Sequence, residues 1–137
     1  MGLSITVNNY DSFDIGYISF MNFRLELAEI YNVKLGEMYR RWAFGGLPYT
    51  REKPLSDKEF EEFKNIAGDL LIFLAHPDTD GSFTPSESRT IYLKIKDLKM
   101  DYRISETYHG QGDFNVFERL KKMFYYSWKN RRKVIFS

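Results

Sequence analysis

The segment from position 76 to position 87, HPDTDGSFTPSE, has the residue types and the spacing of a cation-binding loop. Asp78, Asp80 and Glu87 carry carboxylates, and Ser82 could add its backbone carbonyl. Oxygen atoms of these kinds are the ligands that Ca²⁺ prefers. Gly81 would allow the sharp turn that wraps a loop around an ion. These residues therefore form a candidate calcium site.

The same segment resembles the loop of an EF-hand. Asp78 and Asp80 would take the third and fifth loop positions, and Glu87 would be the bidentate ligand. The resemblance implies a helix on each side of the loop and calcium as the cofactor. His76, however, stands where that motif has an aspartate. Ca²⁺ is a hard cation and favours oxygen over an imidazole nitrogen.

A purely structural interpretation, which we prefer, explains the same residues. Pro77 ends one helix, because proline disfavours the helical conformation of the residue before it. Phe83 anchors the loop in the core, while Thr84 and Glu87 form a capping box with Pro85 at the first helical position. We therefore expect no cofactor, and weak calcium binding at most.

The C-terminal part of the chain combines basic and aromatic side chains. The basic residues that could contact phosphates are Lys121, Lys122, Lys129, Arg131, Arg132 and Lys133. Tyr125, Tyr126 and Trp128 lie between them, and bases can stack on such rings. The pattern indicates nucleic acid as a possible partner. In the alternative interpretation, the basic groups only complement a helix dipole and the rings belong to the core.

A second candidate surface lies at Arg40, Arg41 and Trp42, just before two adjacent glycines. Arginine and tryptophan are enriched among the residues that carry most of the binding energy at protein interfaces. They predict contact with a protein partner, and self-association could use the same surface. In the alternative interpretation, Trp42 is buried and both arginines are solvated.

Catalysis has little support in the sequence. The two histidines, His76 and His109, fall in predicted loops, where each could pair with a nearby acid, Asp78 or Asp113. Cysteine is absent, which excludes a thiolate zinc site, a cysteine nucleophile and a disulfide. No nucleophile elbow, phosphate-binding loop or zinc-binding helix motif is present. We therefore expect a protein without enzymatic activity.

Composition indicates one globular domain over residues 1–137. Hydrophobic residues make up 43% and aromatic residues 18% of the chain, enough for a ring-rich core. The net charge of +1 divides into −3 over residues 1–69 and +4 over residues 70–137. No signal-peptide pattern is seen, and the longest apolar run, Leu70–Ala75, is too short to cross a membrane. We expect a cytoplasmic protein that does not bind membranes.

The hydrophobic pattern predicts a mainly α fold of four to five helices with a small sheet. Alternating apolar residues within Met1–Asn8 predict a strand, and Val134–Phe136 predicts a second strand paired with it. Asn8–Asp14 is predicted to be a turn or loop. The predicted helices cover residues 17–31, 37–44, 56–76, 85–102 and 113–131, and loops are predicted near residues 45–54 and 108–112.

The last three helices are predicted to pack through their apolar faces. Ser56 and Glu59 form a capping box at the clearest helix start, and Asp113 is the expected cap of the last helix. Residues 90–96 also alternate as a strand would, and we choose the helix because of its cap and its length. The predicted core contains Phe60, Phe63, Leu70, Leu74, Ile91, Ile95, Leu98, Phe117, Leu120 and Phe124.

The chain also resembles small uncharacterised phage and prophage proteins that begin Met-Gly-Leu. The helical segment Phe20–Ala28, the turn Asp80–Pro85 and the strand Val134–Phe136 carry this resemblance, and the chain departs from it between Gly36 and Pro54. The resemblance implies a phage or prophage source and no particular activity. Together with the surface-prone tyrosines and arginines, it favours an accessory protein that binds a protein partner. Nucleic-acid binding through the C-terminal helix and calcium binding by a solitary loop are the alternatives.

Overall fold

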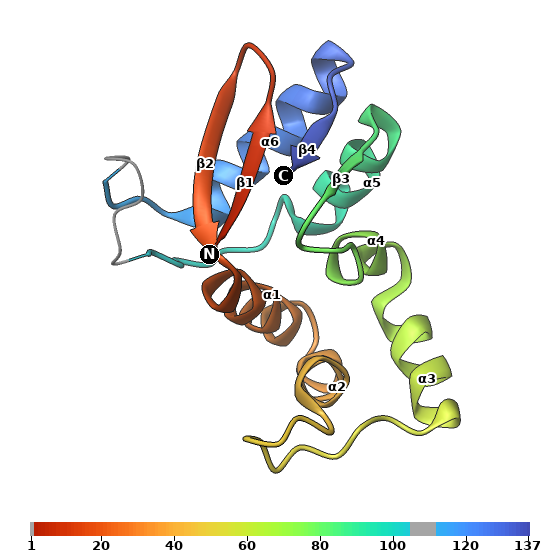
Figure 1. Cartoon of the computed structure of the whole chain (residues 1–137). Coiled ribbons are helices and arrows are strands. Elements are labelled where there is room, and N and C mark those ends of the chain that lie inside the picture. Colours follow the sequence, from red (N-terminus) through yellow and green to blue (C-terminus); the bar gives the residue numbers. More distant parts are fainter. Residues whose placement is uncertain (1, 105–111) are drawn as a thin grey trace.

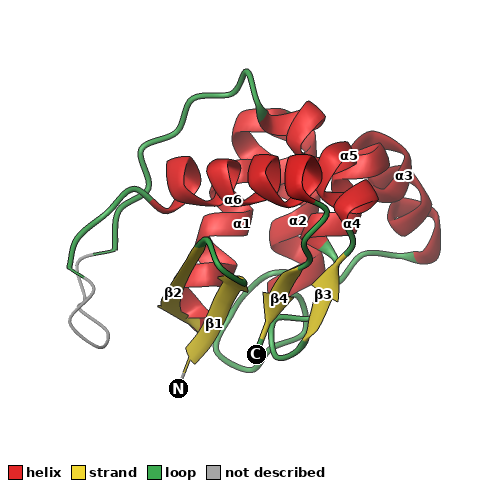
Figure 2. Cartoon of the chain, turned by 90° about the horizontal axis from the view of Figure 1, so that it is seen from above, coloured by secondary structure: helices red, strands yellow, loops and turns green. Residues whose placement is uncertain are grey.

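The computed structural model describes residues 2–104 and 112–137, and these residues form two layers (Figure 1). One layer is a four-stranded antiparallel sheet with the strand order β2-β1-β4-β3. The helices form the second layer and lie on one side of the sheet (Figure 2). The fold is thus mixed α and β, and the mainly α expectation was too narrow.

A hairpin of β1 (Gly2–Val7) and β2 (Asp11–Gly16) opens the chain. Asn9 has a φ of 65° in the turn between the strands, a conformation that asparagine tolerates better than most residues. The turn or loop predicted over Asn8–Asp14 is confirmed only for its first three residues, because β2 begins at Asp11.

Strand β2 was missed because aspartate and glycine are depleted in strands. Its apolar residues Phe13 and Ile15 alternate with polar ones and are buried against the helices. On the outer face, the hydroxyl groups of Ser12 and Thr6 lie 2.7 Å apart across the hairpin. Pairing with β1 therefore outweighs the weak strand propensity of the segment.

The terminal strands pair as expected. Strand β4 (Val134–Phe136) lies beside β1, with Ile5 opposite Phe136. Its other edge pairs with β3 (Gly81–Phe83), a three-residue strand that the sequence did not indicate. The strand β4 therefore joins the N-terminal hairpin to the middle of the chain.

Helices α1 (Tyr17–Tyr31) and α2 (Val33–Phe44) follow the hairpin. The bounds of α1 are those predicted. Helix α2 begins before the predicted Glu37, because the Asn32 side chain caps it by accepting a hydrogen bond of 3.0 Å from the Leu35 N–H.

The continuous helix predicted over the next segment is broken. Helix α3 (Asp57–Ala67) is followed by a single turn of 3₁₀-helix, η1 (Gly68–Leu70), and by the short helix α4 (Leu71–Leu74). Gly68 ends α3 with φ 53° and ψ −133°, a conformation largely restricted to glycine. The capping box predicted at Ser56 is confirmed.

The last two helices, α5 (Pro85–Ile95) and α6 (Val116–Asn130), are both shorter than predicted. Residues 90–95 are helical, so the strand alternative for this region is wrong. Asn115, rather than Asp113, caps α6 and accepts a hydrogen bond of 3.0 Å from the Phe117 N–H. Five helices are longer than one turn within the described ranges, in line with the expected four to five.

The core lies between the sheet and the helices. Of the ten predicted core residues, eight are buried, and Phe60 and Leu98 are partly buried. At its centre the Phe73 ring meets Phe20 at 6.0 Å and Phe124 at 5.8 Å between centroids, both edge to face. Such arrangements are favourable because the electron-rich face of one ring meets the positive edge of another.

Two further observations bear on the sequence-based expectations. No helix in the described ranges is long and apolar enough to cross a membrane. The loop predicted at residues 108–112 lies outside the described residues, apart from Gly112.

Gly81, at the start of β3, has a backbone conformation that residues with a side chain rarely adopt. Its φ is 107°, and an added Cβ would lie 2.9 Å from Cε1 of His76. Gly81→Ala should lower the free energy of unfolding by about 1–3 kcal/mol through backbone strain, with a further loss from displacing His76. Gly46→Ala is the matched control, because Gly46 has a φ of 80° but open space around the added Cβ. Urea denaturation that finds equal losses for the two variants would contradict the contact with His76.

Candidate functional site

Two of the predicted calcium ligands, Glu87 and Ser82, have other partners in the structure. Glu87 accepts a hydrogen bond of 2.9 Å from the Thr84 N–H, and its own N–H donates to Thr84 Oγ1 at 3.1 Å, which confirms the capping box. Ser82 pairs with Ile135 in the sheet. Across residues 2–104 and 112–137, no cluster of three or more His, Asp or Glu side chains could hold a metal ion. Neither Asp78 nor Asp80 belongs to such a cluster.

Calcium titration tests the structural interpretation of this loop. We predict weak calcium binding or none, because the Glu87 carboxylate is committed to the start of α5. Titration calorimetry should therefore show no micromolar binding. Micromolar binding that disappears in Asp80→Ala would mean that the loop rearranges around the ion, and would overturn this interpretation.

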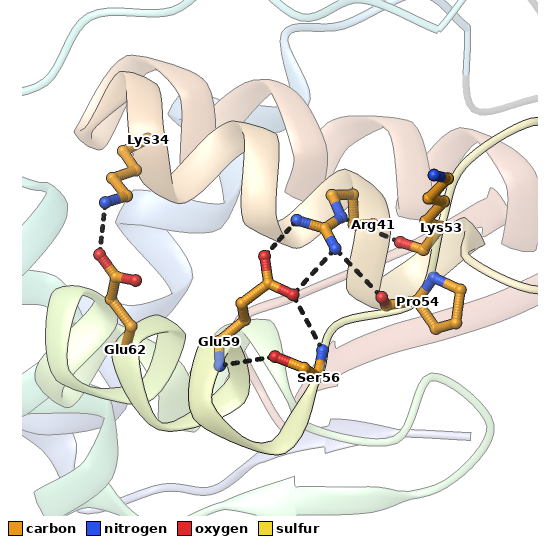
Figure 3. A network of polar contacts seen from close by, with 7 residues as sticks. All are labelled: Lys34, Arg41, Lys53, Pro54, Ser56, Glu59 and Glu62. Atoms are coloured by element: carbon orange, nitrogen blue, oxygen red, sulfur yellow. Dashed lines mark hydrogen bonds and ion pairs between the residues drawn. The ribbon is translucent and has the colours of Figure 1, made fainter.

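Arg41 on α2 makes hydrogen bonds to the 45–56 loop and to α3 (Figure 3). Its Nη1 and Nη2 donate to the two carboxylate oxygens of Glu59 at 2.6 and 3.0 Å. Its Nε donates to the Lys53 carbonyl at 3.0 Å, and Nη2 also donates to the Pro54 carbonyl at 3.1 Å. Arg41 therefore ties α2 to the 45–56 loop and to α3, and its donors already have partners inside the chain.

The neighbours of Arg41 have separate roles. Arg40 forms an ion pair with Glu29 at 3.0 Å on the surface of α1. Trp42 is 38% exposed, and its ring packs near those of Tyr39 and Phe63, with centroids 5.9 and 5.5 Å away. The structure thus does not gather Arg40, Arg41 and Trp42 into one exposed cluster.

The Glu59 carboxylate also completes the capping box of α3. It accepts a hydrogen bond of 3.0 Å from the Ser56 N–H, in addition to those from Arg41. These donors favour the ionised form and hold the pKa of Glu59 at about 2, below its ordinary 4.5, with Arg41 contributing most. Because the folded pKa is lowered, the resulting stabilisation is present above pH 4.5 and is lost as the pH falls toward 2.

The pH dependence of Glu59→Gln tests this network. The variant should unfold at lower urea concentration than the parent protein at neutral pH, and the difference should shrink as the pH falls from 4.5 toward 2. Glu61→Gln is the control, since Glu61 carries the same charge on the same helix, has a side chain that is 67% exposed, and pairs with the neighbouring Lys64. If both variants lose the same stability at neutral pH, Glu59 has no special role.

Four tyrosines surround a pocket of about 330 Å³, which we call the tyrosine pocket. Tyr10 comes from the β1–β2 turn, Tyr92 from α5, and Tyr125 and Tyr126 from α6. Tyr10 stacks on Tyr126 with centroids 4.1 Å apart and planes 10° from parallel. Tyr10 and Tyr125 remain 43% and 45% exposed, so aromatic surface is available to a ligand.

Basic residues line the same pocket. Lys96, Lys121 and Lys122 lie around it, together with Glu118. Lys121 is partly engaged, because its Nζ donates to the Leu98 carbonyl at 3.1 Å and pairs with Glu118 at 3.1 Å. Lys122 and Lys96 are exposed. On α6, the pocket residues Glu118, Lys122 and Tyr126 recur every four positions, which places them on one helix face.

A second hollow continues this surface past Trp128 and contains Arg89, Lys129 and Arg131. Lys129 Nζ lies 3.9 Å and Arg89 Cζ 5.5 Å from the centroid of the Trp128 ring. The Trp128 ring also lies near Tyr92, with centroids 6.2 Å apart, and so connects the two hollows. We call the tyrosine pocket and this second hollow together the aromatic–basic surface.

An ion pair positions the Tyr10 wall of the pocket. Arg119 on α6 donates to both carboxylate oxygens of Asp11 at 2.8 and 2.7 Å and to the Ser12 carbonyl at 3.0 Å. The hydrogen bond from Arg119 is the main reason that the pKa of Asp11 is lowered. Because Asp11 begins β2, this pair holds the β1–β2 turn, and with it Tyr10, against α6.

The sequence identified part of this surface. Four of the six predicted basic residues line it, namely Lys121, Lys122, Lys129 and Arg131. Arg132 and Lys133 are exposed in the turn before β4 and line neither hollow. Sequence reasoning missed Tyr10, Tyr92, Arg89 and Lys96. The four-residue spacing of Tyr92 and Lys96 could have placed them on one face of α5, whereas the position of Tyr10 depends on how the hairpin packs.

His76 does not form the pair with Asp78 that the sequence suggested. His76 places its ring nitrogens against the carbonyl oxygens of Pro77 at 2.8 Å and Ser82 at 3.3 Å, rather than against Asp78. His109, whose pairing with Asp113 was considered, lies outside the described residues.

Comparison with known proteins yields no relative. No protein-family model matches the chain. No curated protein and no solved structure matches it either. The resemblances to phage proteins and to an EF-hand loop therefore stay predictions.

Proposed function

We propose that the protein binds single-stranded nucleic acid through the aromatic–basic surface and has no enzymatic activity of its own. The observation that carries this proposal is the gathering of four tyrosine rings and three lysines around one pocket. Aromatic rings offer flat faces on which any base can stack, and lysines neutralise the phosphates that flank the base.

The shape of the surface favours a single strand over a duplex. The tyrosine pocket is a hollow of about 330 Å³, at the small end of the range for ligand sites, and suits one unstacked base. A base within a duplex is already stacked and paired, so it would first have to be extruded at a cost of a few kcal/mol. The neighbouring Lys129 and Arg131 could then follow the backbone of the strand.

The charge of this surface supports binding despite a net charge of only +1 for the whole chain. Among the described residues, Glu118 is the one acidic residue that lines the two hollows. The basic residues that line them are Arg89, Lys96, Lys121, Lys122, Lys129 and Arg131. Because the attraction is local, affinity should depend strongly on salt concentration.

Anisotropy of a fluorescent oligothymidylate, measured over a range of salt concentrations, tests the proposal. Tyr125→Ala should weaken binding by about 1–3 kcal/mol, roughly 5- to 150-fold, through the loss of stacking. Lys122→Ala should reduce the slope of log K against log salt by about 0.7, the value for one phosphate contact on a single strand.

Matched controls lie elsewhere on the molecule. Tyr49→Ala removes a ring that is 80% exposed in the 45–56 loop, and Lys94→Ala removes an exposed charge of α5 outside the pocket. Both should leave the affinity unchanged. Equal binding of a duplex of the same length, or equal losses in variants and controls, would refute the proposal.

A protein partner, ranked first by the sequence, is the second proposal. The observation that favours it is the exposed apolar surface where α1 meets α2, with Ile30 40% and Val33 84% exposed. A specific protein captured from the native host by the parent protein and by Lys122→Ala, but not by Val33→Asp, would support it. Capture that depends on Lys122 and disappears after nuclease treatment would instead support the nucleic-acid proposal.

A further inference from the structure

A third hollow of about 310 Å³ lies between the helices α1 and α2 and the segment after α4. It is lined by Met21, Arg24, Tyr39, Trp42, Ala43, Ala75, His76, Pro77 and Asp78, and we call it the Arg24 cavity. It shares no lining residue with the aromatic–basic surface, so a ligand bound here would not depend on the proposed nucleic-acid binding.

Arg24 is the unusual residue of this cavity. Its side chain is only 6% exposed, and burial lowers its pKa. The guanidinium carbon lies 4.5 Å from the centroid of the Phe20 ring and 5.3 Å from that of Phe73, which partly compensates for the buried charge. Its Nε and Nη2 have no hydrogen-bond partner among the described residues. A buried cation with unused donors is costly, because the protein does not replace its lost hydration.

The unused donors fit a carboxylate. Nε and Nη2 lie side by side on one edge of the guanidinium, and such an edge can donate two parallel hydrogen bonds to one carboxylate. Asp78 raises the pKa of Arg24 through its negative charge, yet it makes no hydrogen bond to Arg24. Tyr39 interacts with the guanidinium, but its hydroxyl cannot supply the missing anion.

The remaining walls define the rest of the ligand. Tyr39, Trp42 and Met21 present aromatic and apolar surface, which favours an apolar body. Asp78 adds a carboxylate to the wall, which would repel a multiply charged anion such as phosphate and attract an ammonium group. A cation, an acid and an apolar wall together match a small zwitterion.

We propose that the Arg24 cavity binds a free α-amino acid with an apolar or aromatic side chain. The ligand carboxylate accepts from Nε and Nη2 of Arg24, its ammonium group donates to Asp78, and its side chain packs against Tyr39 and Trp42. Both nitrogens are shielded from solvent, so binding requires the cavity wall to move. Residues 75–78, which line the cavity and form neither helix nor strand, are the part of the wall that we expect to move.

Titration calorimetry with three amino acids and two single-charge analogues of phenylalanine tests the proposal. L-phenylalanine, L-leucine and L-tryptophan carry both charges, whereas 3-phenylpropionate lacks the ammonium group and phenethylamine lacks the carboxylate. We expect at least one of the amino acids to bind, and each single-charge analogue of phenylalanine to bind about tenfold more weakly than phenylalanine, or not at all. No binding of any amino acid, or equal binding of 3-phenylpropionate and phenylalanine, would overturn the proposal.

Protein variants locate the binding site. Asp78→Asn should weaken amino-acid binding about tenfold, while Asp80→Asn, an exposed acid outside the cavity lining, should not. Arg24→Gln should abolish it. Should Arg24→Gln fail to fold, Ala43→Leu fills the cavity and keeps both charges, and it should abolish binding as well. Binding that persists in Asp78→Asn and Ala43→Leu would overturn the assignment, and it would leave the nucleic-acid proposal untouched.

Discussion

The pairing of β1 with β4 is the constraint on which the rest of this structure depends. It places Ile5 opposite Phe136 and so closes a loop over nearly the whole chain. Closing so long a loop has an entropic cost that grows only slowly with its length. The buried apolar side chains of both strands offset this cost. Once β4 is in place, β3 can pair with its free edge and α6 is held above the sheet. The hairpin turn then meets α6, where Tyr10 stacks on Tyr126.

The sequence predicted those features that depend on residues close to one another along the chain. The capping boxes at Ser56 and at Thr84 depend on residues three positions apart, and both are confirmed. The terminal strands were predicted from the alternating apolar residues of Met1–Asn8 and from the apolar run Val134–Phe136. Strand β3, by contrast, has three residues and exists only because β4 lies beside it, so no local pattern could reveal it. The break at Gly68 was hidden by an apolar stripe that continues across it.

The same distinction applies to the candidate surfaces. Lys122 and Tyr125 lie on one helix, and the C-terminal basic and aromatic pattern pointed to them. Arg24 lies within an apolar helix pattern, and its burial beside Phe20 and Phe73 depends on how α1 packs against α4. Arg41 was expected on a surface, but its guanidinium group donates to Glu59 on α3. Helix α3 is separated from α2 by the twelve-residue loop 45–56. Side chains that meet partners distant in sequence are therefore the ones that sequence reasoning placed least well.

The strand order also determines how the molecule can meet its own copies. Strands β2 and β3 lie at the two edges of the sheet, where unpaired backbone groups could template edge-to-edge association. On one side, β3 offers only three residues, too few for a stable intermolecular ladder. On the other side, β2 carries the acidic residues Asp11 and Asp14, and charged residues on an edge strand disfavour pairing with another chain. Both edges of the sheet thus carry features that disfavour strand addition between copies.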